Sequence, residues 1–293
     1  MNLAELANAT TALPLSALSS DRQLASDIQD ALIIFGILDR PVDGKFGPVS
    51  NWALREFCAH QKIDIKDGLT KTLARALLDA NALSLRVKAG PDLAGRIAAC
   101  MMRLNHWINR HPDCLNIVYV EGMNVDGTPN DNKPNRFNDC RGLLSIDNKG
   151  KPVLRGIWKG TTEPGKYWTE NPMNPKGAAR IAFGQYKSWS VGRYNGHDAL
   201  LQVDDVVVYR DLNKDYDRVG DRTDKGLFGI HHHWGYNYPD DDLSNSSAGC
   251  LVGQKTAEHK TFMKMLAQDP RYIGNNAYRF VATIVPYGDL PAP

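Results

Sequence analysis

Apolar residues in the first part of the chain recur at three- and four-residue steps, which is the spacing of one face of an amphipathic helix. The first such stretch begins at Ser20 and stops at Gly36, and its repeating apolar positions are Leu24, Ile28, Ala31 and Leu32. A second helix is expected to open at Pro48, because proline suits the first helical turn. Thr70 has the side chain of a typical N-cap and is expected to start a third helix. We therefore expect a three-helix bundle over residues 20–83.

The segments that flank this bundle have less regular patterns. Residues 1–19 are rich in alanine, threonine, serine and leucine, and we expect them to form a loosely ordered leader. Residues 84–112 are expected to be a linker that continues into an amphipathic helix from Pro91 to about Arg110. The apolar face of that helix comprises Leu93, Ile97, Met101, Leu104 and Trp107.

After Asp113 the apolar spacing changes to the two-residue alternation of β-strands. The candidate strands are residues 116–120, 142–146, 153–158, 199–203, 206–209 and 280–285. Gly, Pro, Asn and Asp separate these runs, and one late helix is expected near Ala257–Gln268. The sequence therefore predicts an α+β protein of two domains, the second a mostly β domain over residues 113–293.

Length and composition are those of a globular protein with a sizeable core. The chain has 293 residues, of which 42% are hydrophobic and 23% are charged. The formal net charge is only +2, so we expect no broad cationic surface for nucleic acid or anionic lipid. No segment approaches the roughly 18 to 20 apolar residues that a membrane-spanning helix needs. Nothing in the pattern indicates an oligomeric state.

One short window combines three consecutive histidines, His231 to His233, with Cys250. A thiol becomes a strong nucleophile as the thiolate, and a nearby imidazole is the usual base that forms it. Gly249 precedes the cysteine, and backbone N–H groups beside small residues can approach a substrate oxygen. These residues predict a Cys–His active site in which Cys250 is the nucleophile and Gly249 helps to bind the oxyanion.

Ser247-Ala-Gly-Cys250, together with the preceding histidines, resembles the active-site motif of the L,D-transpeptidase (YkuD-like) family. That family carries a histidine at a strand end and, after a loop, a Ser/Thr-His-Gly-Cys motif. Ala248 stands in place of the family's second histidine, and Val252 in place of a polar or basic residue that holds the donor peptide. The resemblance implies a YkuD-like catalytic domain that uses no cofactor. The residues expected to contact substrate are Ser247, Trp234 and Tyr236.

The base is either His231 or His233. If residues 229–233 form a strand, these two side chains face the same way and His232 faces the other. Gly235 follows His233 closely, which favours His233 at a strand end beside a turn. His231 is separated from Ser247 by 15 residues, a gap nearer to that of the familiar transpeptidases.

The predicted bundle resembles the small peptidoglycan-binding domain found at the ends of many wall-lytic enzymes. The resemblance rests on Ile28-Gln29, Leu32, Gly36, Asp43-Gly44, Phe46-Gly47 and Phe57. It implies that Asp43 and Phe46 contact peptidoglycan, whereas the alternative is that they only shape the turn and core of a small bundle. A second set of short motifs lies within residues 115–288: Thr162-Glu-Pro-Gly, Gly184-Gln-Tyr, Tyr209-Arg-Asp-Leu-Asn, Gly226-Leu-Phe-Gly-Ile, His233-Trp-Gly-Tyr and Ser247-Ala-Gly-Cys. Through these motifs the region resembles phage and bacterial proteins that pair such a domain with a YkuD-like part.

Two kinds of metal site need consideration, although we expect neither. His231 and His233 share a strand face and are candidate zinc ligands together with His197, His259 or Cys250, but the HExxH and paired CxxC spacings are absent. Residues 211–217 alternate carboxylates and an amide as calcium loops do, but Tyr216 replaces the required glycine.

Other side chains leave alternatives open. Cys114 and Cys140 are either bridged or, like Cys58 and Cys100, reduced and buried. Glu163 lies in a turn as a lone acid, and no second carboxylate for a glycosidase is identified. Five aromatic residues either line a groove for sugar or peptide or belong to the core: Trp158, Tyr167, Trp168, Tyr186 and Trp189.

The resemblances imply an enzyme that cleaves the peptides of bacterial peptidoglycan through a cysteine acyl-enzyme, in the manner of an endolysin or a delivered effector. The alternatives are an L,D-transpeptidase that forms or exchanges cross-links and a non-catalytic wall-binding or virion structural protein. The first residues lack the basic region and apolar run of a secretory signal. We therefore expect a protein made in the cytoplasm that acts at the cell wall or periplasm after release or delivery.

Overall fold

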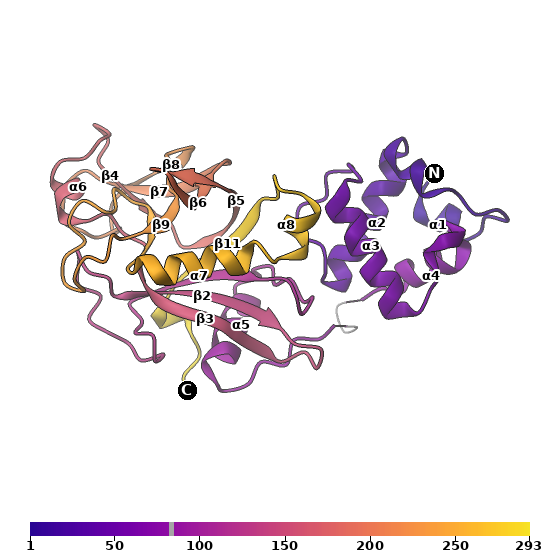
Figure 1. Cartoon of the computed structure of the whole chain (residues 1–293), viewed down its shortest axis with the longest axis horizontal. Helices are drawn as coiled ribbons and strands as arrows, with labels where there is room; N and C mark the ends of the chain where they lie inside the picture. The colour runs from indigo at the N-terminus through magenta and orange to yellow at the C-terminus, as the bar shows by residue number, and fades with distance from the viewer. Residues whose placement is uncertain (82–84) are drawn as a thin grey trace.

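The structure, a computed structural model, describes residues 1–81 and 85–293 and is of mixed α+β type. The predicted fold class is confirmed at that level. Figure 1 shows the N-terminal helices gathered at one end of the molecule and the sheets at the other. A late helix, α8 (Pro270–Gly274), lies between the two ends and contacts the helical one.

The helical region, residues 1–81, contains helices of both α and 3-10 type. The α-helices are α1 (Leu3–Leu6), α2 (Arg22–Phe35), α3 (Pro48–Gln61) and α4 (Lys71–Leu78), and the 3-10 helices are η1 (Leu15–Ser19) and η2 (Ile65–Asp67). The expected boundary signals are confirmed. Gly36 ends α2 with a φ of +108°, Pro48 is the first residue of α3, and Thr70 accepts a hydrogen bond from the Leu73 N–H at 3.2 Å.

Residues 1–19 are ordered, which corrects the expectation of a loosely ordered leader. Asn2 and Glu5 form a capping box around the start of α1. Leu3, Leu6 and Leu18 are buried in the same apolar core as α2, α3 and α4. A helix of four residues, such as α1, is too short to show a helical repeat of apolar positions in the sequence.

The helix after the bundle, α5 (Leu93–Arg103), is shorter than the predicted helix from Pro91 to about Arg110. The chain leaves the helix at Asn105, whose φ is +55°. Trp107 therefore does not continue the apolar face of α5, which is a correction. Its indole N–H instead donates a hydrogen bond to Asp39 at 3.0 Å, and the ring joins the core of the helical region.

A closed barrel forms most of the β-region, residues 113–293, and runs in the order β1-β11-β5-β6-β9-β10-β3-β2. Its strands are β1 (Asn116–Glu121), β2 (Asp139–Ile146), β3 (Pro152–Thr161), β5 (Gly184–Tyr194), β6 (His197–Gln202), β9 (His232–Trp234), β10 (Leu251–Gly253) and β11 (Phe280–Pro286). A second, three-stranded sheet contains β4 (Ala178–Ile181), β7 (Val206–Asp211) and β8 (Arg222–Gly226). The remaining helices are α6 (Lys166–Glu170), α7 (Thr256–Leu266) and the 3-10 helix η3 (Tyr287–Asp289).

The six predicted strands are present, as β1, β2, β3, β6, β7 and β11, and the predicted late helix is α7. The sequence pattern missed β4, β5, β8 and β10. β8 reads Arg-Thr-Asp-Lys-Gly and has no apolar alternation, and β10 has only three residues. Short or polar strands of this kind are stabilised by their partners in the sheet, which sequence periodicity does not report.

A buried charge pair joins the helical region to the β-region. Asp39, which follows α2, accepts two hydrogen bonds from the Arg271 guanidinium of α8, at 3.0 and 3.1 Å. The Tyr278 hydroxyl donates to the same carboxylate. Although burial opposes ionisation, the Arg271 charge lowers the pKa of Asp39 to about 2. Asp39 and Arg271 are only 3% and 2% exposed, so a desolvated ion pair fixes one region on the other.

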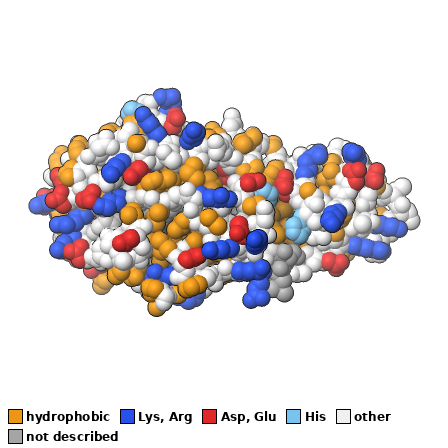
Figure 2. Space-filling view, turned by 60° about the horizontal axis from the view of Figure 1, so that its bottom comes forward, with side chains coloured by type: hydrophobic (Ala, Val, Ile, Leu, Met, Phe, Trp, Pro, Cys, Tyr) orange, Lys and Arg blue, Asp and Glu red, His pale blue; other side chains and the backbone are white. Residues whose placement is uncertain are grey.

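The surface has no strong field of one sign on the face that Figure 2 shows. Acidic and basic side chains are interspersed there, over both the helical end and the β end. This distribution agrees with the small net charge of the chain. Within the described ranges, no helix has the length and apolar character that a bilayer crossing requires.

We expect Arg271→Met to lower the free energy of unfolding by at least about 3 to 5 kcal/mol, because it leaves the carboxylates of both Asp39 and Asp269 buried without their cation. Urea unfolding followed by circular dichroism measures this change. The matched control is Arg279→Met, which removes an exposed pair with Asp204 and should cost less than about 1 kcal/mol. Equal effects of the two substitutions would contradict the role given to the buried pair.

Candidate active site

The candidate site is built on the parallel pairing of β9 with β10. Leu251 is in register with His232, and Val252 with His233. The ladder is extended by a hydrogen bond from the Leu251 N–H to the His231 carbonyl at 2.9 Å. Cys250, one residue earlier, therefore lies beside His231. Parallel strands need a long connection, and residues 235–250 supply it.

The three histidines alternate between two faces of the strand, as predicted. His231 and His233 both contact the ring of Tyr194, with centroid distances of 5.0 and 4.9 Å. His232 has no exposed surface and packs in the barrel core against Tyr119 and Trp189. Its Nδ1 lies 3.3 Å from the Tyr119 hydroxyl. Burial lowers the pKa of His232 well below its ordinary value, so this histidine is a neutral core residue.

His233 has the hydrogen-bonding pattern of a general base. Its Nδ1 lies 2.8 Å from the Trp234 carbonyl, which can only accept, so Nδ1 carries the proton. Nε2 of the neutral ring is then an acceptor. Burial lowers the pKa of His233 to about 4, and the side chain is 6% exposed.

His231 has the opposite arrangement. The backbone N–H of Gln202 donates to its Nδ1 at 3.0 Å, so the neutral ring carries its proton on Nε2. Burial lowers the pKa of His231 as well. Its basic nitrogen is already engaged, which makes its ring a poorer proton acceptor than that of His233.

Cys250 is buried, with 8% of its surface exposed. The backbone N–H of His231 donates to its Sγ at 3.5 Å, and Sγ lies 3.5 Å from the Gly229 carbonyl. Burial raises the pKa of the thiol to about 11, and the His231 N–H only partly opposes this. Within the described residues, no hydrogen bond joins Sγ to an imidazole nitrogen. The resting group is therefore a thiol beside neutral histidines.

A cavity of about 340 Å³ opens over His233. Its lining is formed by Tyr194, Asn195, His233, Tyr236, Tyr238, Asn245 and Ser246. Tyr194 at the end of β5 lines this cavity and contacts the rings of both His231 and His233, and burial raises its pKa. Sequence reasoning missed Tyr194, since β5 gave no recognisable strand pattern.

The loop before Cys250 is held by Ser247, which corrects its predicted contact with substrate. Ser247 has no exposed surface, and its hydroxyl lies 2.8 Å from the Glu163 carbonyl and 3.0 Å from the Cys250 carbonyl, to which it can donate. It also accepts the Gly249 N–H at 3.2 Å. The Gly249 N–H is therefore not free to bind an oxyanion, which corrects that prediction as well.

Gly249 is required for the shape of this loop. Its φ is +119°, and a Cβ at this position would lie 2.3 Å from the Ala179 carbonyl of β4. Behind the loop, the Glu163 carboxylate pairs with Arg180, and Glu163 is only 4% exposed. Glu163 is thus a paired structural acid.

The other residues predicted to contact substrate are distributed over the molecule. Tyr236 is 42% exposed and lines the His233 cavity. Trp234 is not brought to that cavity, because strand alternation turns it toward α7, where it meets the ring of His259 at a centroid distance of 5.9 Å. It also packs on His197 of β6, with ring centroids 3.8 Å apart. Its predicted place in the substrate cavity is therefore wrong.

Asp43 and Phe46 lie in the helical region, away from this cavity. The buried side chain of Gln29 clamps their loop, since its amide donates to Asp43 Oδ1 at 2.9 Å and its carbonyl accepts the Gly44 N–H at 2.9 Å. Phe46 is half-buried and packs against the helical core. Asp43 therefore shapes the loop and Phe46 packs on the core, and their contact with peptidoglycan stays a prediction.

Within residues 1–81 and 85–293, no group of three or more His, Cys, Asp or Glu side chains is arranged to hold a metal ion. Asp211 instead accepts the N–H groups of Asp215 and Tyr216, at 3.2 and 3.1 Å, and so stabilises the acidic turn. All five cysteines are free and buried, so Cys114 and Cys140 are not bridged.

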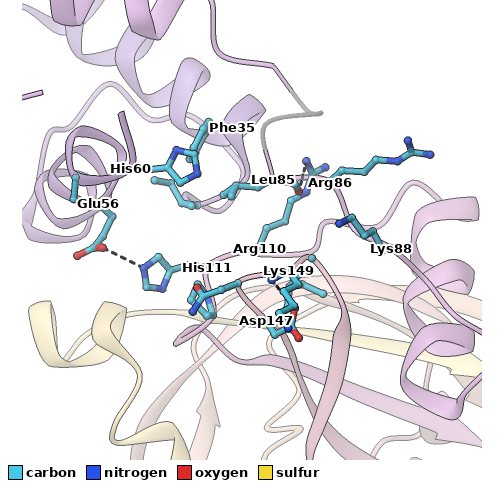
Figure 3. A pocket seen from close by; sticks show the side chains of 16 residues that line it. Phe35, Glu56, His60, Leu85, Arg86, Lys88, Arg110, His111, Asp147 and Lys149 are labelled. Atoms are coloured by element: carbon cyan, nitrogen blue, oxygen red, sulfur yellow. Dashed lines mark hydrogen bonds and ion pairs between the residues drawn. The ribbon is translucent and has the colours of Figure 1, made fainter. Parts of the chain in front are cut away.

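A separate cavity of about 460 Å³ lies between the helical region and the β-region. Figure 3 shows it between α3 and the barrel, with Glu56 and His111 paired at 3.2 Å on one side and Arg86, Lys88 and Lys149 on the other. Neither Cys250 nor any of the three consecutive histidines lines it. It is therefore distinct from the candidate active site.

Neither a protein-family model nor a curated protein matches the chain. Among solved structures, the chain is similar to a fused Zn-dependent amidase/peptidase/peptidoglycan-binding domain-containing protein from Clostridium acetobutylicum ATCC 824, at 15% identity. The alignment covers 93% of this chain and 98% of that chain, with a TM-score of 0.29. A score this low does not establish a common fold.

We expect iodoacetamide to alkylate Cys250 slowly at neutral pH. The reactive thiolate should increase about tenfold per pH unit up to the thiol pKa of about 11. Peptide mass spectrometry between about pH 5 and pH 10 measures the rate, with Cys250→Ala as the control for the other cysteines. A rate that levels off below pH 7 would contradict the neutral pair and indicate a preformed thiolate–imidazolium pair.

Proposed function

We propose that this protein is a cysteine peptidase that cleaves the stem or cross-link peptides of bacterial peptidoglycan through an acyl-enzyme on Cys250. The observation that carries the proposal is the parallel pairing of β9 with β10, which brings Cys250 beside the strand face of His231 and His233. The choice of peptidoglycan rests on the resemblances of residues 20–82 and 115–288.

His233 is the proposed base. The Trp234 carbonyl holds the proton on Nδ1 and leaves Nε2 as the acceptor, whereas Nδ1 of His231 already accepts the Gln202 N–H. His231 serves instead through its backbone, since its N–H donates to the Cys250 sulfur. Because no hydrogen bond joins thiol and imidazole in the free protein, proton transfer requires a side-chain rotation or one bridging water.

The reaction follows from these roles. Nε2 of His233 accepts the thiol proton while Sγ forms a bond to the carbonyl carbon of the scissile amide. The developing oxyanion is bound by the backbone N–H of Cys250, which donates to no acceptor in the described part of the chain. The C–N bond then breaks, and the imidazolium returns its proton to the leaving amine. Finally, water attacks the thioester carbon and gives one proton to His233. The C–S bond breaks, His233 returns that proton to the departing sulfur, and the released acid loses its remaining proton to solvent and leaves as the carboxylate.

Hydrolysis is favoured over transpeptidation with the donor peptide that the L,D-transpeptidase family uses. Val252 occupies the position at which the L,D-transpeptidase family has a polar or basic residue for the donor peptide. Its side chain has no exposed surface and packs with Phe137 and Leu243. The family's contact with the donor is therefore missing at this position. The alternative is that the acyl group passes from Cys250 to an amine instead of water, in which case the protein is an L,D-transpeptidase.

We also propose a role for each of the two regions and a place where the protein acts. The helical region acts as a peptidoglycan-binding domain and the β-region as a YkuD-like catalytic domain. The protein reaches the wall or periplasm by release or delivery and acts there as an endolysin or an effector does.

We expect Cys250→Ala to abolish the release of muropeptides from purified sacculi, by at least about a thousandfold, while binding to sacculi is kept. His233→Gln should lower the rate about 100- to 10,000-fold, and His231→Gln should lower it less. Mass spectrometry of the digested sacculi measures the products. A hydrolysed bond adds one water, whereas transpeptidation exchanges one amine for another.

The matched control is Cys58→Ala, which removes another buried thiol, in the helical core, and should leave the rate unchanged. If Cys250→Ala released muropeptides at the wild-type rate, the proposed mechanism would be wrong. If wild type binds sacculi but releases and exchanges nothing, the protein is a non-catalytic wall-binding protein.

A further inference from the structure

A second groove adjoins the His233 cavity and is lined by two aromatic residues of α6. Its volume is about 650 Å³, and its lining comprises Asn135, Lys166, Tyr167, Trp168, Glu170, Asp242, Ser244 and Asn245. Asn245 also lines the His233 cavity. The two cavities therefore form adjoining parts of one surface, with Asn245 between them.

Tyr167 and Trp168 differ from the other aromatic residues that the sequence suggested for a groove. Trp189 has no exposed surface, and Trp158 and Tyr186 pack against the barrel core. Tyr167 is 54% exposed and meets Trp168 edge to face, with ring centroids 4.9 Å apart. Trp168 itself is half-buried. An exposed ring that packs on a half-buried one beside a cavity is typical of a binding surface.

This aromatic pair is fixed relative to the nucleophile. The Trp168 indole N–H donates to the Asn245 carbonyl at 2.9 Å, and Asn245 lies in the loop that leads to Cys250. The Gly165 N–H before α6 donates to the Ser247 carbonyl at 2.8 Å. Two hydrogen bonds thus tie α6 to the loop of the candidate nucleophile.

The polar side chains of the groove are held in position by one another. The Asn135 amide donates to Asp242 Oδ1 at 3.0 Å, and Asn135 Oδ1 accepts the Lys166 N–H at 2.9 Å. The Tyr238 hydroxyl donates to Asn245 Oδ1 at 3.3 Å, which orients that amide. The Asn245 Nδ2 donates to no acceptor among the residues that the structure describes, and it remains available to a ligand.

We propose that this groove binds a pyranose ring of the glycan strand, so that the protein holds peptidoglycan by its sugar while Cys250 attacks the attached peptide. The proposal rests on the proposed function. The C–H groups on one face of a pyranose complement the negative face of an aromatic ring, and its hydroxyls need amide and carboxylate partners of the kind found here. One basic and two acidic side chains line the groove, which favours a neutral sugar over an anionic polymer.

The test uses the full chain carrying Cys250→Ala and a soluble β-linked N-acetylhexosamine oligosaccharide, followed by isothermal titration calorimetry. Tyr167→Ala should weaken binding about tenfold, because it removes the more exposed ring. Tyr167→Phe keeps the ring and should keep the affinity. Ile273→Ala removes an exposed apolar side chain of α8 and should change nothing. Circular dichroism and urea unfolding check that each variant is folded.

A kinetic comparison separates this inference from the proposed function. With Cys250 intact, Tyr167→Ala should raise KM at least about fivefold for a glycan-bearing muropeptide and leave KM for a sugar-free stem peptide unchanged. Equal effects on both substrates, or no loss of oligosaccharide binding, would overturn the sugar site and leave the peptidase standing. Oligosaccharide binding that depends on Tyr167, in a protein that cleaves neither substrate, would support the sugar site and overturn the peptidase.

Discussion

The register between β9 and β10 is the constraint on which the candidate site depends. In this parallel pairing Leu251 is matched with His232, so Cys250 and His231 lie side by side. The two-residue repeat of a strand then directs His232 and Leu251 into the core, where neither has exposed surface. A slip of one residue would exchange the buried histidine with its neighbours and disrupt the core. The barrel core and the site geometry are thus stabilised by the same pairing.

Burial also determines the charge state of the site. It raises the pKa of Cys250 to about 11 and lowers that of His233 to about 4, so both groups are neutral at rest. A neutral pair reacts only when substrate places a carbonyl in reach, which limits unwanted chemistry at the thiol. Ser247 and Gly249, expected to act on substrate, instead fix the loop that carries Cys250. The ion pair of Asp39 with Arg271 adds a rigid attachment of the helical region to the β-region.

The sequence predicted what local periodicity and capping control. Gly36, Pro48 and Thr70 marked helix ends correctly, and the six strands with apolar alternation were found. What it missed depends on partners far away in the chain. β10 is a strand because β9 and β3 pair with it, and Tyr194 reaches the site from β5. The position of Trp234 could have been predicted from the sequence. The strand alternation that separates His232 from His233 also turns Trp234 away from the cavity.

If Cys250 carries the acyl group during turnover, the adduct is visible in the intact mass of the protein. The protein is incubated with soluble muropeptides, quenched in acid, weighed by mass spectrometry and then mapped by peptide analysis. We expect an added mass equal to the acyl part of a stem peptide, located on Cys250 and absent from Cys250→Ala. Turnover with an adduct on another residue, or with no adduct on Cys250 even under rapid quenching, would contradict it.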